Sequence, residues 1–231
     1  PVTGETLSVT PEITGAAGHH LARVRRLRPG ERITAGDGDG AWREYVVVHV
    51  GSAGVVADAA GPRRVDPGSS VGVSVAVALT KGGLEDVVTA VTELGAVRVV
   101  PFVSERVVVR WDATRAARGV ERLRAAARAA AEQSRRARRP VIEPVAEFAD
   151  VLGRPGLVLA DRLGVPAGSL EPPAAGEWTV AVGPEGGFTA DELERAANCP
   201  RLALGPHVLR AVTAPVAAVA ALSARLTDRS G

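Results

Sequence analysis

The sequence predicts an α/β protein in two parts: a small β-rich N-terminal domain and a larger C-terminal domain built on a parallel sheet. Two observations carry this prediction. Residues 1–68 hold short valine-rich runs broken by Gly-Asp and Gly-Ser, a pattern typical of strands joined by tight turns. From residue 69 onward, continuous apolar runs alternate with helical patterns, as in a parallel sheet covered on both faces.

The N-terminal part reads as a small barrel or a meander. Residues 31–59 alternate strand-like runs with glycine-bearing breaks. The stretch 61–70, "GPRRVDPGSS", is rich in Gly, Pro and Ser and marks a linker. We therefore expect one domain over residues 1–68 and a second over residues 69–231.

The C-terminal part alternates strands and helices in chain order. The expected strands are 71–79, 97–103, 157–161, 178–182 and 201–205. The expected helices are 84–95, 113–136, 189–197 and 214–226. Because the strands are apolar throughout rather than alternating, both faces of the sheet should be covered by helices.

Composition bounds the class of protein. A chain of 231 residues that is 46% hydrophobic can bury a sizeable core. Its one cysteine, Cys199, excludes an internal disulfide and a cysteine-based zinc site, and it favours a reduced compartment. No apolar run reaches the roughly 18 residues of a membrane span, and the first residues lack the layout of a signal peptide. We expect a soluble cytoplasmic protein without a bound metal, since no His/Asp/Glu cluster has ligand spacing.

Two glycine-bearing loops follow expected strands. "VGPEGGF" (182–188) leaves the strand 178–182, and "LGPHVLRAVTA" (204–214) leaves the strand 201–205. In open parallel sheets, ligands sit outside the carboxyl ends of the strands. Loops with little side chain can offer main-chain N–H and C=O groups to the edge of a flat ligand such as adenine. The alternative is two tight strand-to-helix turns. A Rossmann fold is excluded, because the first strand is followed by "LTKGG" instead of G-x-G-x-x-G.

These loops carry a family resemblance. "VGPEGGFTADEL" and "LALGPHVLRAVTA" resemble the two signature loops of SPOUT-superfamily methyltransferases, and within it the 16S ribosomal RNA uridine N3-methyltransferase family, usually called RsmE. Shorter matches run in order along the chain: His19-His20 with Arg23, Val24 and Arg26; Lys81-Gly82; Glu93-Leu94-Gly95; Ser104-Glu105-Arg106; and Glu132-Gln133-Ser134 with Arg136.

The resemblance implies a fold, a cofactor and a substrate. It implies a C-terminal trefoil knot that binds S-adenosylmethionine, an N-terminal PUA-like RNA-binding β-barrel, and a homodimer whose site is completed across the interface. It also implies methylation of N3 of uridine 1498 in the 16S RNA of the small ribosomal subunit. The cofactor-binding residues it implies are Leu159, Ala160, Val182, Gly183, Pro184, Glu185, Gly186, Gly187, Leu204, Gly205, Val208, Leu209 and Arg210.

Two positions depart from the family pattern. Where the family typically has Leu-Arg-Thr-Glu-Thr, this chain has Leu209-Arg210-Ala211-Val212-Thr213, so the carboxylate is lost at Val212. Arg135 stands where the family usually has glycine. The first departure leaves the general base unassigned.

Methylation of uridine N3 requires loss of a proton, so the site needs a base or stabilisation of the negative charge. Arg210 is the first candidate for stabilising that charge, and a surface or phosphate-contacting role is its alternative. Glu185 is the candidate base, although a carboxylate beside glycines often caps a helix. His207 is the one histidine in either loop and is more often incidental at such a place.

Arginine is concentrated in residues 115–139 and 23–32, which favours a polyanion partner. For residues 115–128, an ordinary solvated helix face explains the arginines as well as RNA binding does. In "SRRARR" (134–139) the arginines are more closely spaced, which favours phosphate contact. The predicted RNA-binding residues are His20, Arg23, Arg26, Lys81, Arg106, Arg135, Arg136 and Arg138. The target should be an unpaired base, because Watson–Crick pairing hides N3.

Two other functions stay open at this point. One is a non-catalytic RNA-binding protein of the same fold, which Val212 favours. The other is a SPOUT methyltransferase that acts on another RNA base.

Overall fold

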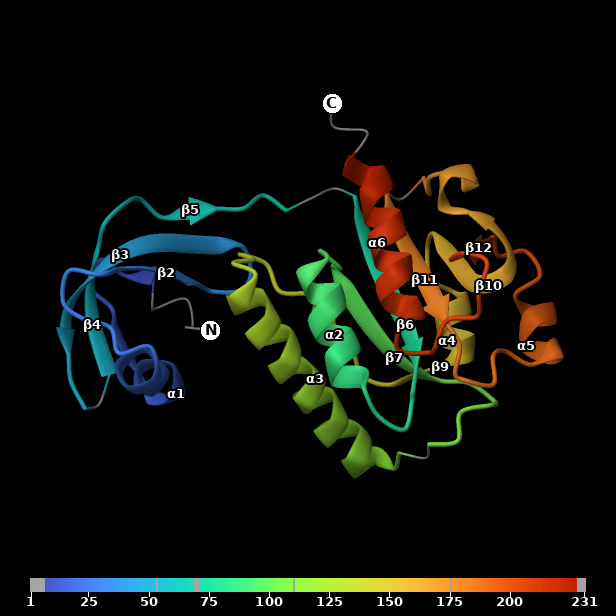
Figure 1. Ribbon diagram of the computed structural model, residues 1–231, viewed down its shortest axis with the longest axis horizontal. Coiled ribbons are helices and arrows are strands. Elements are labelled where there is room, and N and C mark those ends of the chain that lie inside the picture. The colour runs from blue at the N-terminus through green and yellow to red at the C-terminus, as the bar shows by residue number, and fades with distance from the viewer. Residues whose placement is uncertain (1–6, 53, 69–70, 110, 175, 228–231) are drawn as a thin grey trace. The chain divides into compact units, whose positions relative to one another are not determined.

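The computed structural model describes residues 7–52, 54–68, 71–109, 111–174 and 176–227. The chain forms two compact units. The first comprises Pro1–Gly68 and Arg135–Arg139, and the second comprises Ser69–Ser134 and Pro140–Gly231. Figure 1 shows the antiparallel strands of the first unit and the helix-covered sheet of the second.

The first unit is an antiparallel sheet. Its strands are β1 (Glu12–Thr14), β2 (Arg32–Gly36), β3 (Ala41–Val50), β4 (Gly54–Ala59) and β5 (Arg64–Val65). The strands β2, β3 and β4 pair in succession, as the meander pattern predicts, and β1 pairs with the far edge of β4. Tyr45 is fully buried at the centre of this sheet. A short helix, α1 (Gly15–His19), continues into a π-helical turn (His20–Val24), so His19 and His20 both lie within a helical segment.

The segment Arg135–Arg139 belongs to the first unit, although the chain reaches it directly from a helix of the second. Main-chain hydrogen bonds attach it to the turn between β2 and β3. Gly40 N donates to Ala137 O at 3.1 Å, and Arg139 N donates to Gly38 O at 2.9 Å. The first unit is therefore completed by residues from the middle of the chain, which the sequence places in the second domain.

The second unit is built on a parallel sheet, which confirms the predicted α/β fold. Its strands are β6 (Gly72–Ala78), β7 (Arg98–Val103), β8 (Val141–Ile142), β9 (Ala146–Glu147), β10 (Leu157–Pro166), β11 (Glu177–Val182) and β12 (Arg201–Ala203). Their order is β12-β10-β11-β6-β7-β8, with β9 also paired to β7. Every residue of the central strand β6 is buried, as expected of a strand covered on both faces.

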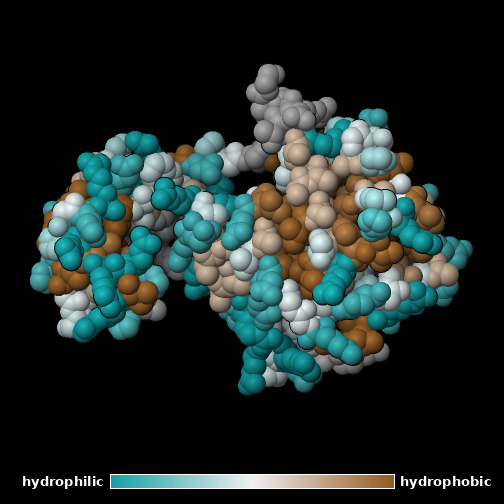
Figure 2. Space-filling model, viewed as in Figure 1, coloured by the Kyte–Doolittle hydropathy of each residue, from teal (hydrophilic) through white to brown (hydrophobic). Residues whose placement is uncertain are grey.

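Helices cover both faces of this sheet. They are α2 (Leu84–Glu93), α3 (Ala113–Gln133), α4 (Phe148–Leu152), α5 (Ala190–Arg195) and α6 (Ala214–Thr227). The helices α2 and α6 contact each other over β6 and β11, and α4 lies behind the sheet in the same view (Figure 1). Figure 2 shows that apolar residues gather over α6 and beside it on the face toward the viewer.

Three differences from the expected elements have local causes. The long helix ends at Gln133 rather than at 136, because Arg135 takes a left-handed φ of 58°. The strand expected at 157–161 continues to Pro166, with a register shift between Ala160 and Val165. The elements β8, β9 and α4 were not expected, because segments of two to five residues carry too little periodicity to be recognised.

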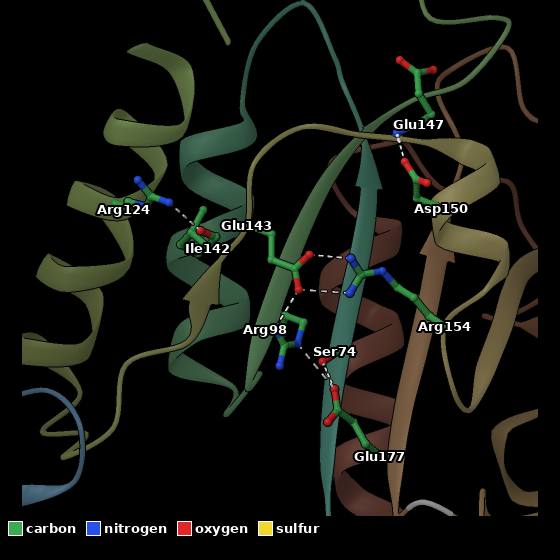
Figure 3. A network of polar contacts seen from close by, with 9 residues as sticks. All are labelled: Ser74, Arg98, Arg124, Ile142, Glu143, Glu147, Asp150, Arg154 and Glu177. Atoms are coloured by element: carbon green, nitrogen blue, oxygen red, sulfur yellow. Dashed lines mark hydrogen bonds and ion pairs between the residues drawn. The ribbon is translucent and has the colours of Figure 1, made fainter. Parts of the chain in front are cut away.

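Charged side chains tie together the amino edge of the parallel sheet (Figure 3). Arg98, at the start of β7, donates to Glu143 Oε1 at 2.6 Å. Arg154, just before β10, donates to both carboxylate oxygens of Glu143. Glu177, at the start of β11, accepts from the Ser74 hydroxyl and lies 3.9 Å from the Arg98 guanidinium. Ser74, Arg98 and Glu177 lie within β6, β7 and β11, whereas Glu143 follows β8 and Arg154 precedes β10. The network therefore links five strands at this edge of the sheet.

Candidate active site

The two glycine-bearing loops leave the carboxyl edge of the same sheet, on either side of β10. We call residues 183–189 the glycine loop and residues 204–213 the C-terminal loop. The glycine loop follows β11 and the C-terminal loop follows β12, and β10 lies between these two strands. In register, Leu159 of β10 pairs with Ala181 on one side and with Arg201 on the other. The structure therefore brings the loop residues and Leu159 and Ala160 to one edge of the sheet.

The glycine loop is compact and anchored by an aromatic cluster. Gly187 has a φ of 68°, and its N–H donates to Pro184 O at 2.8 Å to close a turn. Phe188 packs against Phe102 and Phe148, with ring centroids 6.4 Å and 5.1 Å away. A Cβ on Gly183 would lie 3.3 Å from the Phe188 ring. Glycine at position 183 therefore leaves room for the Phe188 ring, which anchors the loop. This space is filled by the protein itself and is not open to a ligand.

The C-terminal loop is open. Gly205 has a φ of 129°, and a Cβ added there would meet nothing within 4 Å. Among the described residues, the N–H groups of Gly205, Val208 and Leu209 have no hydrogen-bond acceptor. The loop closes only at its end, where Thr213 N and Ala214 N both donate to Arg210 O at 2.9 Å. Main-chain donors that stay free beside a bare glycine fit a ligand that supplies acceptors.

Val212 makes an apolar contact across the edge of the sheet. A Cβ added to Gly83, which has a φ of 82° and precedes α2, would lie 3.0 Å from Val212 Cγ1. Val212 thus joins the C-terminal loop to the loop after β6. At the position where the resemblance puts a glutamate, this chain has a packing contact and no ionisable group.

Comparison with known proteins assigns the chain to a family. A family model described as "RNA methyltransferase domain" matches residues 67–223, and one described as "RNA methyltransferase PUA domain" matches residues 13–57. The Ribosomal RNA small subunit methyltransferase E of Mycobacterium bovis is 36% identical over 235 residues, which cover 94% of this chain and 87% of the relative. The chain belongs to the ribosomal RNA small subunit methyltransferase E family.

Other members of this family agree over nearly the whole length. The Bacillus subtilis enzyme is 32% identical, over 93% of this chain and 90% of its own. The crystal structure of the Neisseria gonorrhoeae enzyme bound to S-adenosyl methionine superposes with a TM-score of 0.84 at 29% identity, covering 95% of this chain and 94% of that one. The fold is that of this methyltransferase family, with a PUA-like antiparallel sheet at its N-terminal end.

The two candidate catalytic side chains of this family member lie exposed in different loops. Arg210 is exposed in the C-terminal loop and Glu185 is exposed in the glycine loop. Neither side chain makes a hydrogen bond or an ion pair with another described residue, so both are available to a ligand. His207 is exposed as well and has no partner within that part of the chain.

The glycine loop contacts the segment 104–106 after β7, which no local sequence pattern indicates. Arg106, expected to bind RNA, donates from Nη1 to Gly186 O at 2.7 Å. Glu192 of α5, which was not a candidate, accepts from Glu105 N at 3.0 Å. The spacing Thr189-x-x-Glu192 is a capping-box signature, which could have identified Glu192 as a cap, but no local signal indicates its distant partner.

The other predicted RNA-binding residues divide between the two units. His20, Arg23 and Arg26 are exposed in the first unit, and Arg26 has a left-handed φ of 52°. Lys81 is exposed in the loop after β6, in the second unit. Arg135 is exposed in the first unit and also left-handed, which accounts for the family's usual glycine at this position.

Three arginines of the 134–139 run, Arg136, Arg138 and Arg139, are partly buried. The Arg138 guanidinium donates from Nε and Nη2 to Asp66 O, at 3.1 Å and 2.7 Å. Burial lowers the pKa of Arg136, and the nearby Asp66 charge opposes that effect. Arg138 therefore has a structural partner, whereas Arg135 presents its side chain to solvent.

Within the residues that the structure describes, no group of three or more His, Cys, Asp or Glu side chains is placed to hold a metal ion. No helix in the same ranges is both long and apolar enough to cross a membrane.

Proposed function

We propose that this protein methylates N3 of a uridine in the 16S RNA of the small ribosomal subunit, at position 1498 in the numbering of that RNA. S-Adenosylmethionine supplies the methyl group when it is bound. The observation that carries the proposal is family membership over 94% of the chain, together with the two glycine-bearing loops that frame β10. Because ribosomal RNA is the acceptor, the proposed place of action is the cytoplasm.

The C-terminal loop has main-chain donors that such a cofactor can use. Gly205, Val208 and Leu209 keep N–H groups without acceptors among the described residues. These donors, with the main chain of the glycine loop, would hydrogen-bond the nucleoside part of the cofactor. Leu159 and Leu204, buried and half-buried at the same edge, would contact its apolar faces.

Arg210 would stabilise the uracil anion. As N3 loses its proton, negative charge spreads onto the neighbouring carbonyl oxygens, and a guanidinium that has no carboxylate partner can pair with it. Glu185 would accept the proton, since Val212 cannot. Val212 lies beside Gly83 and packs against the core, so this position contributes packing and no proton acceptor.

The exposed arginines of the first unit would hold the RNA backbone. We expect Arg135→Gly to lower the salt dependence of RNA binding by about one phosphate contact. The same change should stabilise the fold by about 1 kcal/mol, because glycine accepts the left-handed backbone. Arg138→Ala should instead lower stability, because its guanidinium is bonded to Asp66 O. If the salt dependence of RNA binding is unchanged in Arg135→Gly, Arg135 does not contact an RNA phosphate.

We further propose that the protein is a homodimer and that its C-terminal chain is threaded in a trefoil knot, as the family resemblance implies. Three large apolar side chains at the carboxyl edge favour a covered surface: Leu163, Val165 and Val208 are 75%, 43% and 85% exposed. Light scattering at micromolar concentration should give twice the monomer mass.

Transfer of tritium from labelled S-adenosylmethionine to small-subunit RNA tests the function. The assay uses RNA from a strain that lacks this modification, with fully modified RNA as the control. We expect label on one uridine at N3, located by mass spectrometry of nuclease fragments. If no label enters either free RNA or assembled subunits, the protein binds RNA without methylating it. If the label is found on another base, the protein is a methyltransferase of different specificity.

A further inference from the structure

Glu192 is the only acidic or basic side chain among the buried residues that the structure describes, with 1% of its surface exposed. It lies in the first turn of α5, directly after the glycine loop. Burying a carboxylate is unfavourable unless hydrogen bonds replace its water. The partners of Glu192 therefore indicate why it is there.

A helix cap explains only part of these contacts. In the capping box, Glu192 Oε2 accepts from Thr189 N at 2.9 Å, and Glu192 N donates to Thr189 Oγ1 at 3.2 Å. The same carboxylate accepts from Glu105 N at 3.0 Å and from the Ser104 hydroxyl at 3.2 Å. These last two donors are 87 and 88 residues away in the sequence and have no part in capping α5.

The contacts cross the end of a strand. Ser104 and Glu105 follow β7, and the glycine loop follows β11, while β6 lies between these two strands. Neighbouring strands are about 4.8 Å apart, so the carboxylate links segments whose strands are roughly 10 Å apart.

Two further hydrogen bonds join the same segments. Arg106 Nη1 donates to Gly186 O at 2.7 Å, and Thr189 Oγ1 donates to Glu105 Oε2 at 2.9 Å. The glycine loop is thus tied to the segment 104–106 at its middle and at its end.

We infer that Glu192 is a positioning residue for the cofactor: it holds the glycine loop in its binding shape through the segment 104–106. This inference rests on the proposed function. Its chemistry requires a carboxylate, because all three contacts from Thr189 N, Glu105 N and Ser104 are made to acceptor oxygens. An amide would turn its own N–H₂ toward either Glu105 N or Thr189 N and leave a buried main-chain donor unpaired.

Calorimetric titration with S-adenosylmethionine tests this inference in the full-length protein. Glu192→Gln should raise the Kd about tenfold while the stoichiometry per chain is kept. Glu194→Gln is the matched control, because Glu194 is exposed on the same helix and its side chain has no partner in the described part of the chain. Its Kd should stay within twofold of the parent value.

The readout separates positioning from stability alone. Substitution of a residue that only stabilises the fold would leave the Kd unchanged as long as the variant is fully folded, which circular dichroism checks at the temperature of the titration. A Kd within twofold of the parent in Glu192→Gln would overturn the inference, while leaving the function intact. A parent protein that does not bind the cofactor would contradict the proposed function itself.

Ser104→Ala provides a second variant in case Glu192→Gln does not fold. It removes one of the three donors to the Glu192 carboxylate and should raise the Kd for the cofactor about threefold. The KM for the cofactor should rise as well, and the KM for the RNA should stay unchanged. An unchanged KM for the cofactor in Ser104→Ala, with Glu192→Gln unfolded, would also overturn the inference.

Discussion

The two edges of the parallel sheet are built in opposite ways. At the amino edge, Arg98, Arg154 and Glu143 pair through their side chains, and Glu177 and Ser74 extend the network. At the carboxyl edge, the C-terminal loop keeps main-chain N–H groups without acceptors among the described residues, and the glycine loop is held by the segment 104–106. The charged side chains Glu185 and Arg210 of these two loops have no partners in that part of the chain.

The difference follows from what each edge must do. Charges that satisfy one another hold strands in place and leave nothing for a ligand to bind. Main-chain groups and charged side chains without partners contribute little to local stability, but they can donate or accept hydrogen bonds from a ligand. Changes at the carboxyl edge should therefore alter binding and catalysis, and changes at the amino edge should alter stability.

The largest effect is expected for Gly205→Val. A β-branched side chain disfavours a φ of 129°, and it would fill the open space beside the main-chain donors. The Kd for S-adenosylmethionine, measured by calorimetry, should rise at least 100-fold, about 2.7 kcal/mol.

Gly95→Val is the matched control for this change. Gly95 has a φ of 96°, an added Cβ there is equally free of contacts, and it lies between α2 and the amino end of β7. It should cost similar stability and leave the Kd unchanged. A similar loss of affinity in both variants would show that strain, and not position, decides binding.

Arg210→Ala should reduce kcat about 100-fold, which is typical for loss of one group that stabilises a developing anion. The Kd for the cofactor should change less than threefold, because the cofactor is held mainly by main chain. Steady-state kinetics and calorimetry on the same preparation measure both. Arg210→Lys should recover part of kcat, since it keeps the charge without the planar fork. Equal losses in kcat and affinity would make Arg210 a binding residue.

Glu143→Gln should lower the free energy of unfolding of the second unit by about 2 kcal/mol, because three charge-assisted hydrogen bonds from the guanidinium groups of Arg98 and Arg154 are weakened or lost. Denaturant unfolding followed by circular dichroism measures this loss. The cofactor Kd of the folded variant should match the parent. Weakened cofactor binding in Glu143→Gln would mean that the two edges do not act separately.

The smallest effect concerns pH. Hydrogen bonds from Arg154, and then from Arg98, lower the pKa of Glu143. Its ordinary value is about 4.3, so its ionised form stabilises the fold above that pH, and the stabilisation is lost as pH falls toward the lowered pKa. The stability difference between the parent and Glu143→Gln should thus be constant from pH 7 to pH 5 and shrink below about pH 4. A difference that persists at pH 2.5 would rule out ionisation as its cause.

The sequence predicts those features that depend on local patterns. Apolar runs such as 71–79 predict buried strands, and Gly-Pro after two strands predicts the loops at the carboxyl edge. The roles of Arg138 and Glu192 were missed, because their partners lie 72 and 87 residues away. An arginine in a basic run has the same local pattern whether it meets phosphate or a carbonyl oxygen of its own chain. From the sequence, Val212 is only the position where the family's carboxylate is missing. The structure adds that Val212 lies beside Gly83.

Hydrogen exchange of the main-chain amides, with and without S-adenosylmethionine, tests the central claim most directly, because it reports on the N–H groups themselves. Saturating cofactor should slow exchange in residues 183–189 and 204–213. Peptides that contain Arg98, Glu143 and Glu177 should exchange at the same rate in both states. Protection confined to other segments, or equal protection at both edges of the sheet, would contradict the claim that bare main chain at the carboxyl edge binds the cofactor.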